Sequence, residues 1–204
     1  MYSVRVTISP DSEPVSLGVA KEHLRTYGDH EDVNIQSTYI PTARQFCEDR
    51  TNRQFMTATL ELSLDGFPPG CQPILVPRAP LRSVNSIVYQ GSDGTETTLP
   101  TEDYIVDTRH EPGRIFPAAG KAWPATKHRN AAATVLVEFE AGYGEAWEVP
   151  SGLRAAMLLL IGHYFYHREA VVVGTISSEL AMSVDALLEQ YSYGDEFLDY
   201  GANL

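Results

Sequence analysis

Two histidines, His163 and His167, stand four residues apart near the end of the run SGLRAAMLLLIGHYFYHREAVVVG, residues 151–174. This spacing places both rings on one face of a helix, and Glu169 follows, which would suit zinc in a small metal-dependent hydrolase. The HExxH pattern of such enzymes needs a glutamate at position 164, where the chain has Tyr164. On a helical wheel Glu169 also points away from both histidines. We therefore interpret the pair as structural and predict neither a metal nor a cofactor. A third ligand stays open among His23, His30, His110 and His128.

Four pairs of carboxylates raise the question of acid–base catalysis. One pair suits the first turn of a helix, where negative charge is favoured, another the solvent side of an alternating strand, and a third belongs to the C-terminal tail. No GxSxG elbow, Walker A loop or GxGxxG follows a strand either. We therefore predict no catalytic residues and no enzyme. The pairs are Glu31/Asp32, Glu48/Asp49, Glu138/Glu140 and Asp195/Glu196.

The amino-acid composition limits further which classes of protein the chain can belong to. The chain has 204 residues, of which 43% are hydrophobic, enough for one domain or for one domain with a large insertion. Its 27 acidic and 15 basic residues give a net charge of -12, which disfavours specific binding to nucleic acid. The two cysteines, Cys47 and Cys71, form no disulfide framework, and we expect free thiols.

Membrane insertion and export are also disfavoured. The continuous apolar stretch from Ala155 to Ile161 is far short of the roughly 20 residues that a membrane span needs. The first residues, MYSVRVTISPDSEP, alternate like a strand and lack the basic start and apolar core of a signal peptide.

The N-terminal part predicts a strand followed by helices. Ser16 can cap a helix with an apolar stripe that runs to Tyr27 and ends at Gly28. A second helix begins at Asp29, is kinked or split at Pro41 and closes at Asn52, which tolerates the left-handed conformation.

In residues 55–149 the sequence pattern predicts short strands and turns instead of helices. These strands are ATLELSL, PILV, VNSIVYQ, ETTL, YIVD, RIF and TVLVEFEAGYG.

The order of the elements predicts an α+β fold. It is a small helical bundle, formed by the N- and C-terminal helices, with an inserted antiparallel β module. The segments are 1–54 for the N-terminal strand and bundle helices, 55–149 for the β module, 150–192 for the C-terminal helices, and 193–204 for a tail.

The long helix after Pro150 is apolar around most of its circumference, so it must be buried on more than one side. A domain of this size offers limited cover, and we expect the second side to meet a neighbouring subunit. The candidate subunit contacts are Leu158, Ile161, Phe165 and Tyr166, with Arg168 and Glu169 as ionic partners.

The tail after Tyr191 interleaves large aromatic and apolar residues with acidic ones. This density suits either a frayed terminus or a segment that orders on docking to a partner. The candidate contacts to a partner are Tyr193, Phe197, Leu198 and Tyr200.

Several stretches together resemble one protein family. They are LGVAKEHLR, ARQFCEDRTNRQF, ILVPRAPLRSVNSIVY, GRIFPAAGKAWP and VLVEFEAGYG, the last running into VPSGLRAAMLLLIGHYFYHREAV. Over about residues 16–192 the chain resembles the head-tail connector proteins of tailed bacteriophages, the adaptor or head-completion family. It departs from the family at Pro41, which interrupts the second helix, and at Asn52, where a glycine is expected.

The resemblance implies a structural protein of the virion neck, made in the host cytoplasm. Such a protein forms a homo-oligomeric ring, usually a dodecamer, that binds the portal protein, extends the DNA channel and offers a docking surface to tail or neck proteins. An acidic lumen would let packaged DNA pass without specific binding, and no membrane is involved.

The sequence leaves two other functions open: the metal-dependent hydrolase and a monomeric module whose β insertion binds a ligand. The β module is locally basic, and its cations either face a partner or form an ordinary solvated surface. These cations are Arg78, Arg82, Arg109, Arg114, Lys121, Lys127, His128 and Arg129.

Overall fold

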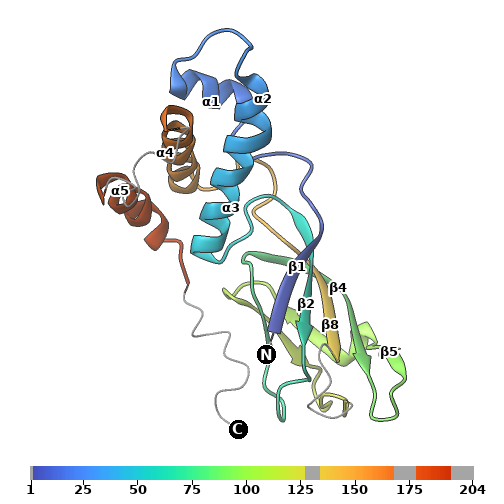
Figure 1. Ribbon diagram of the computed structural model, residues 1–204. Helices are drawn as coiled ribbons and strands as arrows, with labels where there is room; N and C mark the ends of the chain where they lie inside the picture. The colour runs from blue at the N-terminus through green and yellow to red at the C-terminus, as the bar shows by residue number, and fades with distance from the viewer. Residues whose placement is uncertain (1, 127–133, 168–177, 194–204) are drawn as a thin grey trace. The chain divides into compact units, whose positions relative to one another are not determined.

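The computed structural model describes residues 2–126, 134–167 and 178–193. The chain forms two compact units, one of helices and one of strands (Figure 1). Each unit has its own hydrophobic core. A helical unit comprises residues 10–56 and 143–192, and a β unit comprises residues 1–9, 57–142 and 193–204. The combination of helices with antiparallel sheets confirms the predicted α+β class.

The first helices of the helical unit begin and end as local chemistry dictates. The Ser16 hydroxyl accepts the Val19 N–H at 3.3 Å, which confirms the predicted helix start. The predicted split at Pro41 is also confirmed, because a π-helical turn ends just before the helix that carries this proline at its start. Asn52 closes that helix in the left-handed conformation, as predicted, with φ of 57°. The elements are α1 (Leu17–Leu24), α2 (Asp32–Asn34), the π-helical turn Ile35–Tyr39 and α3 (Ile40–Thr51).

Helix α1 ends earlier than the sequence predicts. Arg25 already adopts φ of 53°, and the Thr26 N–H donates back to the Lys21 carbonyl, which closes the helix before Gly28. Tyr27, expected on the apolar stripe, therefore lies beyond the helix and is 86% exposed.

Two C-terminal helices complete the helical unit: α4 (Ser151–Tyr166) and α5 (Ser178–Glu189). Helix α4 packs against α1, α3 and α5 and contributes five buried residues to the core. Among the described residues no helix is long and apolar enough to cross a membrane.

The β unit contains two antiparallel sheets (Figure 1). Their buried side chains form one core. The larger sheet has the order β1-β2-β8-β4-β5 and the smaller one the order β3-β7-β6. A short 3₁₀ turn, Thr101–Asp103, precedes β6. The strands are β1 (Tyr2–Ile8), β2 (Ala58–Leu64), β3 (Ile74–Val76), β4 (Leu81–Gln90), β5 (Glu96–Thr98), β6 (Tyr104–Asp107), β7 (Gly113–Pro117) and β8 (Val135–Ala141).

The strand alternation predicted from the sequence sets the register of the larger sheet. Phe139 of the central strand β8 is paired with Leu60 on one side and Val84 on the other, and it is fully buried. Two segments lie in a different unit from the one that the sequence analysis gave them. Residues 143–149, grouped there with the β module, belong to the helical unit. The N-terminal strand, grouped there with the bundle, pairs along its length with β2 and belongs to the β unit.

Candidate functional site

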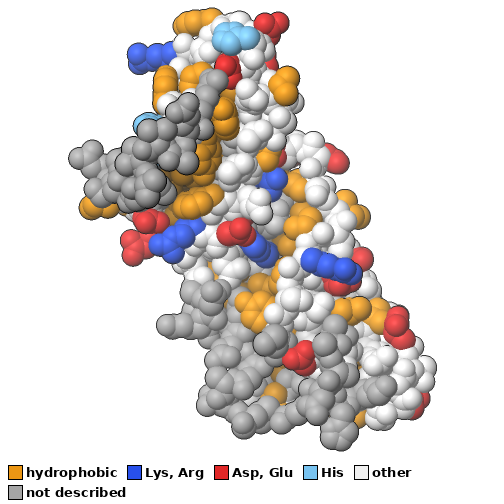
Figure 2. Space-filling model, in the orientation of Figure 1, with side chains coloured by type: hydrophobic (Ala, Val, Ile, Leu, Met, Phe, Trp, Pro, Cys, Tyr) orange, Lys and Arg blue, Asp and Glu red, His pale blue; other side chains and the backbone are white. Residues whose placement is uncertain are grey.

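Helix α4 has two different faces. Leu153, Met157 and Ile161 point into the core of the helical unit and have no exposed surface. Leu158 and Phe165 are only half-buried at the border of this core, and Tyr166 is 68% exposed. Figure 2 shows hydrophobic side chains gathered over the helical unit on this side of the molecule. An apolar strip of α4 is therefore left partly open to solvent.

The candidate subunit contacts do not all lie on the open strip. Leu158, Phe165 and Tyr166 lie on the open strip, and the Tyr166 hydroxyl donates to the Leu24 carbonyl at 3.2 Å. Ile161 is the exception, because the core already covers it completely. Arg168 and Glu169, the expected ionic partners, lie outside the described residues.

The two histidines of α4 stack on one another at the end of the helix. Their ring centroids are 4.6 Å apart with 23° between the planes, and the ring Nδ1 of His167 lies 3.2 Å from the His163 carbonyl oxygen. Burial, and then the charge of His167, lower the pKa of His163, so the neutral ring is favoured. Across the described ranges no three His, Cys, Asp or Glu side chains come together in a way that could hold a metal ion.

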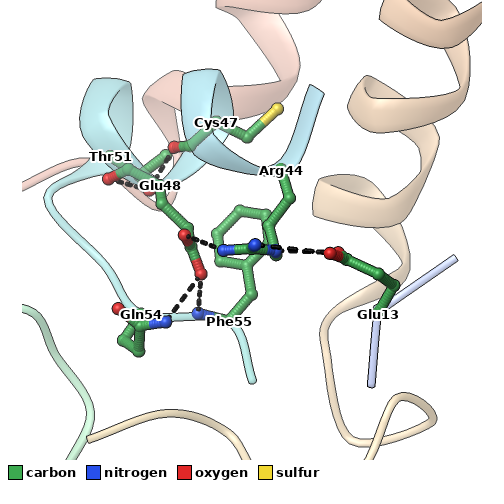
Figure 3. A network of polar contacts seen from close by, with 7 residues as sticks. All are labelled: Glu13, Arg44, Cys47, Glu48, Thr51, Gln54 and Phe55. Carbon is green, nitrogen blue, oxygen red and sulfur yellow. Dashed lines mark hydrogen bonds and ion pairs between the residues drawn. The ribbon is translucent and has the colours of Figure 1, made fainter. Parts of the chain in front are cut away.

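A buried carboxylate, Glu48, organises the end of α3 (Figure 3). It accepts the backbone N–H of Phe55 at 2.9 Å, the side-chain amide of Gln54 at 3.0 Å and the guanidinium of Arg44 at 2.8 Å. Arg44 also donates to Glu13 at 2.7 Å. Burial lowers the pKa of Arg44, but the hydrogen bond to Glu13 and the charges of Glu48 and Glu13 outweigh this and raise the pKa above its ordinary value.

This network and its neighbours hold every point at which the chain enters or leaves the helical unit. Glu13 and Phe55 belong to the first two connections, and both are bound to Arg44 or Glu48. The third connection is held where the Tyr143 N–H donates to the Phe55 carbonyl at 3.0 Å, and the fourth where Arg53 donates to the Tyr191 carbonyl. Each of these four connections therefore has a hydrogen bond to α3 or to the residues that directly follow it.

Three of the four carboxylate pairs lie within the described residues. Glu31 and Asp32 stand at the start of α2, as predicted, and Asp32 forms an ion pair with Lys21 at 2.6 Å. Of the pair Glu48/Asp49, Glu48 is the buried centre just described, which gives it a structural task that the sequence analysis missed. Glu138 and Glu140 lie on the side of β8 away from the core, as their alternation indicated. Glu61, opposite Glu138, is balanced by Arg5 at 2.8 Å.

Of the tail residues, only Tyr193 lies within the described part. Its hydroxyl accepts the Ala79 N–H at 3.1 Å within the β unit, so the side chain is already engaged at the start of the tail. Phe197, Leu198 and Tyr200 lie outside the described residues.

The same architecture occurs in solved structures of other proteins. No protein-family model matches the chain, and no curated protein sequence matches it. Among solved structures, a chain from the neck of an empty gene transfer agent (GTA) particle, computed with C6 symmetry, has a TM-score of 0.74 at 20% identity. The fold is shared with chains of GTA particles. That match covers 94% of this chain and 96% of the other.

Two further solved structures have the same fold. A chain in the virion of a native gene transfer agent particle gives a TM-score of 0.74 at 21% identity and covers 94% of this chain and 95% of that chain. A chain in the neck of a native GTA particle, computed with C12 symmetry, gives 0.71 at 22% identity and covers 94% and 96%. The likeness therefore extends over both units.

Proposed function

We propose that this protein is a structural subunit of the neck of a phage-like particle, where it forms a ring between the portal and the tail. The observation that carries the proposal is the match to a chain of a GTA particle neck over 94% of the protein and 96% of that chain. The shared fold includes both units rather than one common helix pair, which favours a common role over a chance likeness of parts.

The open strip of α4, formed by Leu158, Phe165 and Tyr166, supports assembly into a ring. Exposed apolar strips on a helix that is otherwise buried are typical of subunit interfaces. A ring needs contacts between two different surfaces of the same chain, and the strip would supply one of them. In this proposal Arg168 and Glu169 follow at the end of the strip as ionic partners.

The remaining parts of the proposal concern the partners. The ring would extend the DNA channel, and the net charge of -12 supports a lumen along which DNA passes without adhering. Phe197, Leu198 and Tyr200 would contact the portal or a tail protein. Tyr193 would then anchor the start of this contact segment, because its hydroxyl accepts the Ala79 N–H within the β unit.

The test is the mass of the full-length protein in solution, measured by light scattering alone and after mixing with portal rings from the same particle. A defined cyclic assembly or a stable portal complex is the expected result. A protein that stays monomeric in both experiments would contradict the proposal. Stoichiometric zinc lost on His163→Ala would instead favour the metal-dependent hydrolase, and a ligand bound by the monomer would favour the binding module.

A further inference from the structure

Arg154 is the only permanently charged residue of α4, and the described part of the chain gives its charge no partner. The side chain is half-buried, and its Nε is buried without a hydrogen-bond acceptor. Among the described residues no Asp or Glu forms an ion pair with it. A buried N–H of a charged group that lacks an acceptor costs free energy. The charge of Arg154 therefore contributes nothing to the stability of the isolated chain.

The place of Arg154 in the helix adds to this cost. It is the fourth residue of α4, close to the N-terminal end. The helix dipole puts partial positive charge at that end, so a carboxylate is favoured there and a guanidinium is not. The nearest acidic residue before the helix, Glu148, uses its carboxylate to accept the Glu145 N–H at 2.8 Å. Neither the helix nor the turn before it accounts for a cation at this position.

Arg154 stands at the start of the open strip of α4. Leu158 follows four residues later and Phe165 eleven residues later, and this spacing places the three side chains on one face of the helix. All three are half-buried. This face therefore presents an apolar surface with one unpaired cation, and α4 contains no acidic residue. A complementary surface is apolar and carries a carboxylate, which favours a protein over the phosphates of DNA.

We infer that Arg154 is a further contact residue of the ring seam, where it binds a carboxylate of a second copy of this chain. The inference rests on the proposed ring, in which the open strip of α4 meets the neighbouring subunit. A second copy offers the required charge, because the chain has 27 acidic and 15 basic residues. On the described surface of the helical unit, three of its carboxylates are exposed and form no ion pair: Glu22, Asp29 and Glu189.

Replacing Arg154 by methionine should affect folding and assembly differently. Arg154→Met keeps a long side chain that suits a helix and removes the unpaired charge, so the urea midpoint of the monomer should stay the same or rise. Assembly of the full-length protein, followed by light scattering alone and with portal rings, should need about a tenfold higher concentration. Arg109→Met removes an exposed cation of the β unit and should change neither quantity. A lower urea midpoint with unchanged assembly would mean that Arg154 serves only the fold, which overturns the inference.

A covalent cross-link identifies the occupant. Arg154→Lys keeps the positive charge and places an amine at the seam, which a water-soluble carbodiimide joins to a carboxylate in direct contact. Equal parts of unlabelled and isotopically labelled Arg154→Lys protein are assembled, treated with the carbodiimide, digested and measured by mass spectrometry. We expect the peptide with position 154 to be joined to an acidic peptide that carries the other label. The parent protein is the control, because its guanidinium does not react.

The outcomes separate this inference from the proposed function. If rings form but position 154 is cross-linked only within its own chain, only to the portal protein, or not at all, the inference is wrong and the ring stands. If Arg154→Met assembles as readily as the parent does, the inference is overturned as well, again without loss of the ring. If neither rings nor portal complexes form, both are overturned together.

Discussion

Glu48 accepts the backbone N–H of Phe55 at 2.9 Å across the turn that follows α3. A carboxylate that is almost fully buried in this way needs several donors, and Gln54 and Arg44 supply the others. The Arg53 N–H also donates to the Glu48 carbonyl at 3.1 Å, so two backbone groups after the turn are bound to the same helical residue.

Replacing this carboxylate should therefore be costly. Glu48→Gln removes the ion pair with Arg44 and places an amide group beside the donors of Gln54 and Phe55. We expect a loss of about 3 kcal/mol in the free energy of unfolding, measured by urea denaturation. Glu13→Gln is the matched control, because it weakens only the outer side of Arg44, and it should cost about 1 kcal/mol or less. Equal losses for the two variants would contradict the central role of Glu48.

Gly113 is required by close packing between two strands of the β unit. A Cβ atom at this position would lie 2.5 Å from Cδ2 and 2.6 Å from Cβ of Leu81. Gly113→Ala should therefore destabilise the protein by about 1–3 kcal/mol in thermal or urea unfolding. Gly18→Ala has the opposite expectation, because the nearest atom would be 3.9 Å away and alanine favours the helix. A Gly113→Ala protein as stable as the parent would refute the close contact.

The parts of the fold that the sequence predicted well are those with a local cause. The alternation of TVLVEFEA places Val137 and Phe139 in the core and Glu138 on the open side of β8. Ser16, Pro41 and Asn52 each act on their own helix, so a single residue type is enough to predict the break or the cap.

The misses have a non-local cause. Ile161 could not be assigned to a face from the sequence, since α4 is apolar nearly all round and only its packing against α1, α3 and α5 decides which side is covered. The burial of Glu48 depends on where Phe55 returns after the turn, and the pairing of the N-terminal strand depends on a partner more than fifty residues away. The only available signal for Glu48 was its spacing of four from Arg44, which is common on solvent-exposed helices.

The two cysteines should differ strongly in reactivity. Burial, and then the charge of Glu48, raise the pKa of the Cys47 thiol to about 12, whereas Cys71 is exposed. With a disulfide reagent at pH 8 we expect one thiol to react at once and the second only on unfolding. Above pH 9 the unfolded Cys47 ionises while the folded thiol keeps its proton, so stability should fall as the pH rises toward 12. Cys47→Ala should remove that part of the pH dependence.

The histidine pair predicts a loss of stability at low pH. Because the pKa of His163 is lowered by burial and by His167, the unfolded chain takes up this proton at a higher pH than the folded protein does. Stability should therefore decrease as the pH falls below 6.5. His167→Gln removes the neighbouring charge but not the burial, so an NMR titration should show the pKa of His163 rising partway to its ordinary value. No change in that titration would mean that the two rings do not interact.

The open strip of α4 gives a direct test of the ring. Leu158→Glu places a charge on this strip, which has to lose its water when subunits meet, and we expect at least a tenfold rise in the concentration needed for assembly. Met182→Glu is the matched control, since Met182 is an exposed apolar residue on α5. Circular dichroism should show that both variants fold, and light scattering gives their masses with and without portal rings. If Leu158→Glu assembles as the parent does, the seam must lie elsewhere on the subunit, and α4 would be apolar only to hold its own core together.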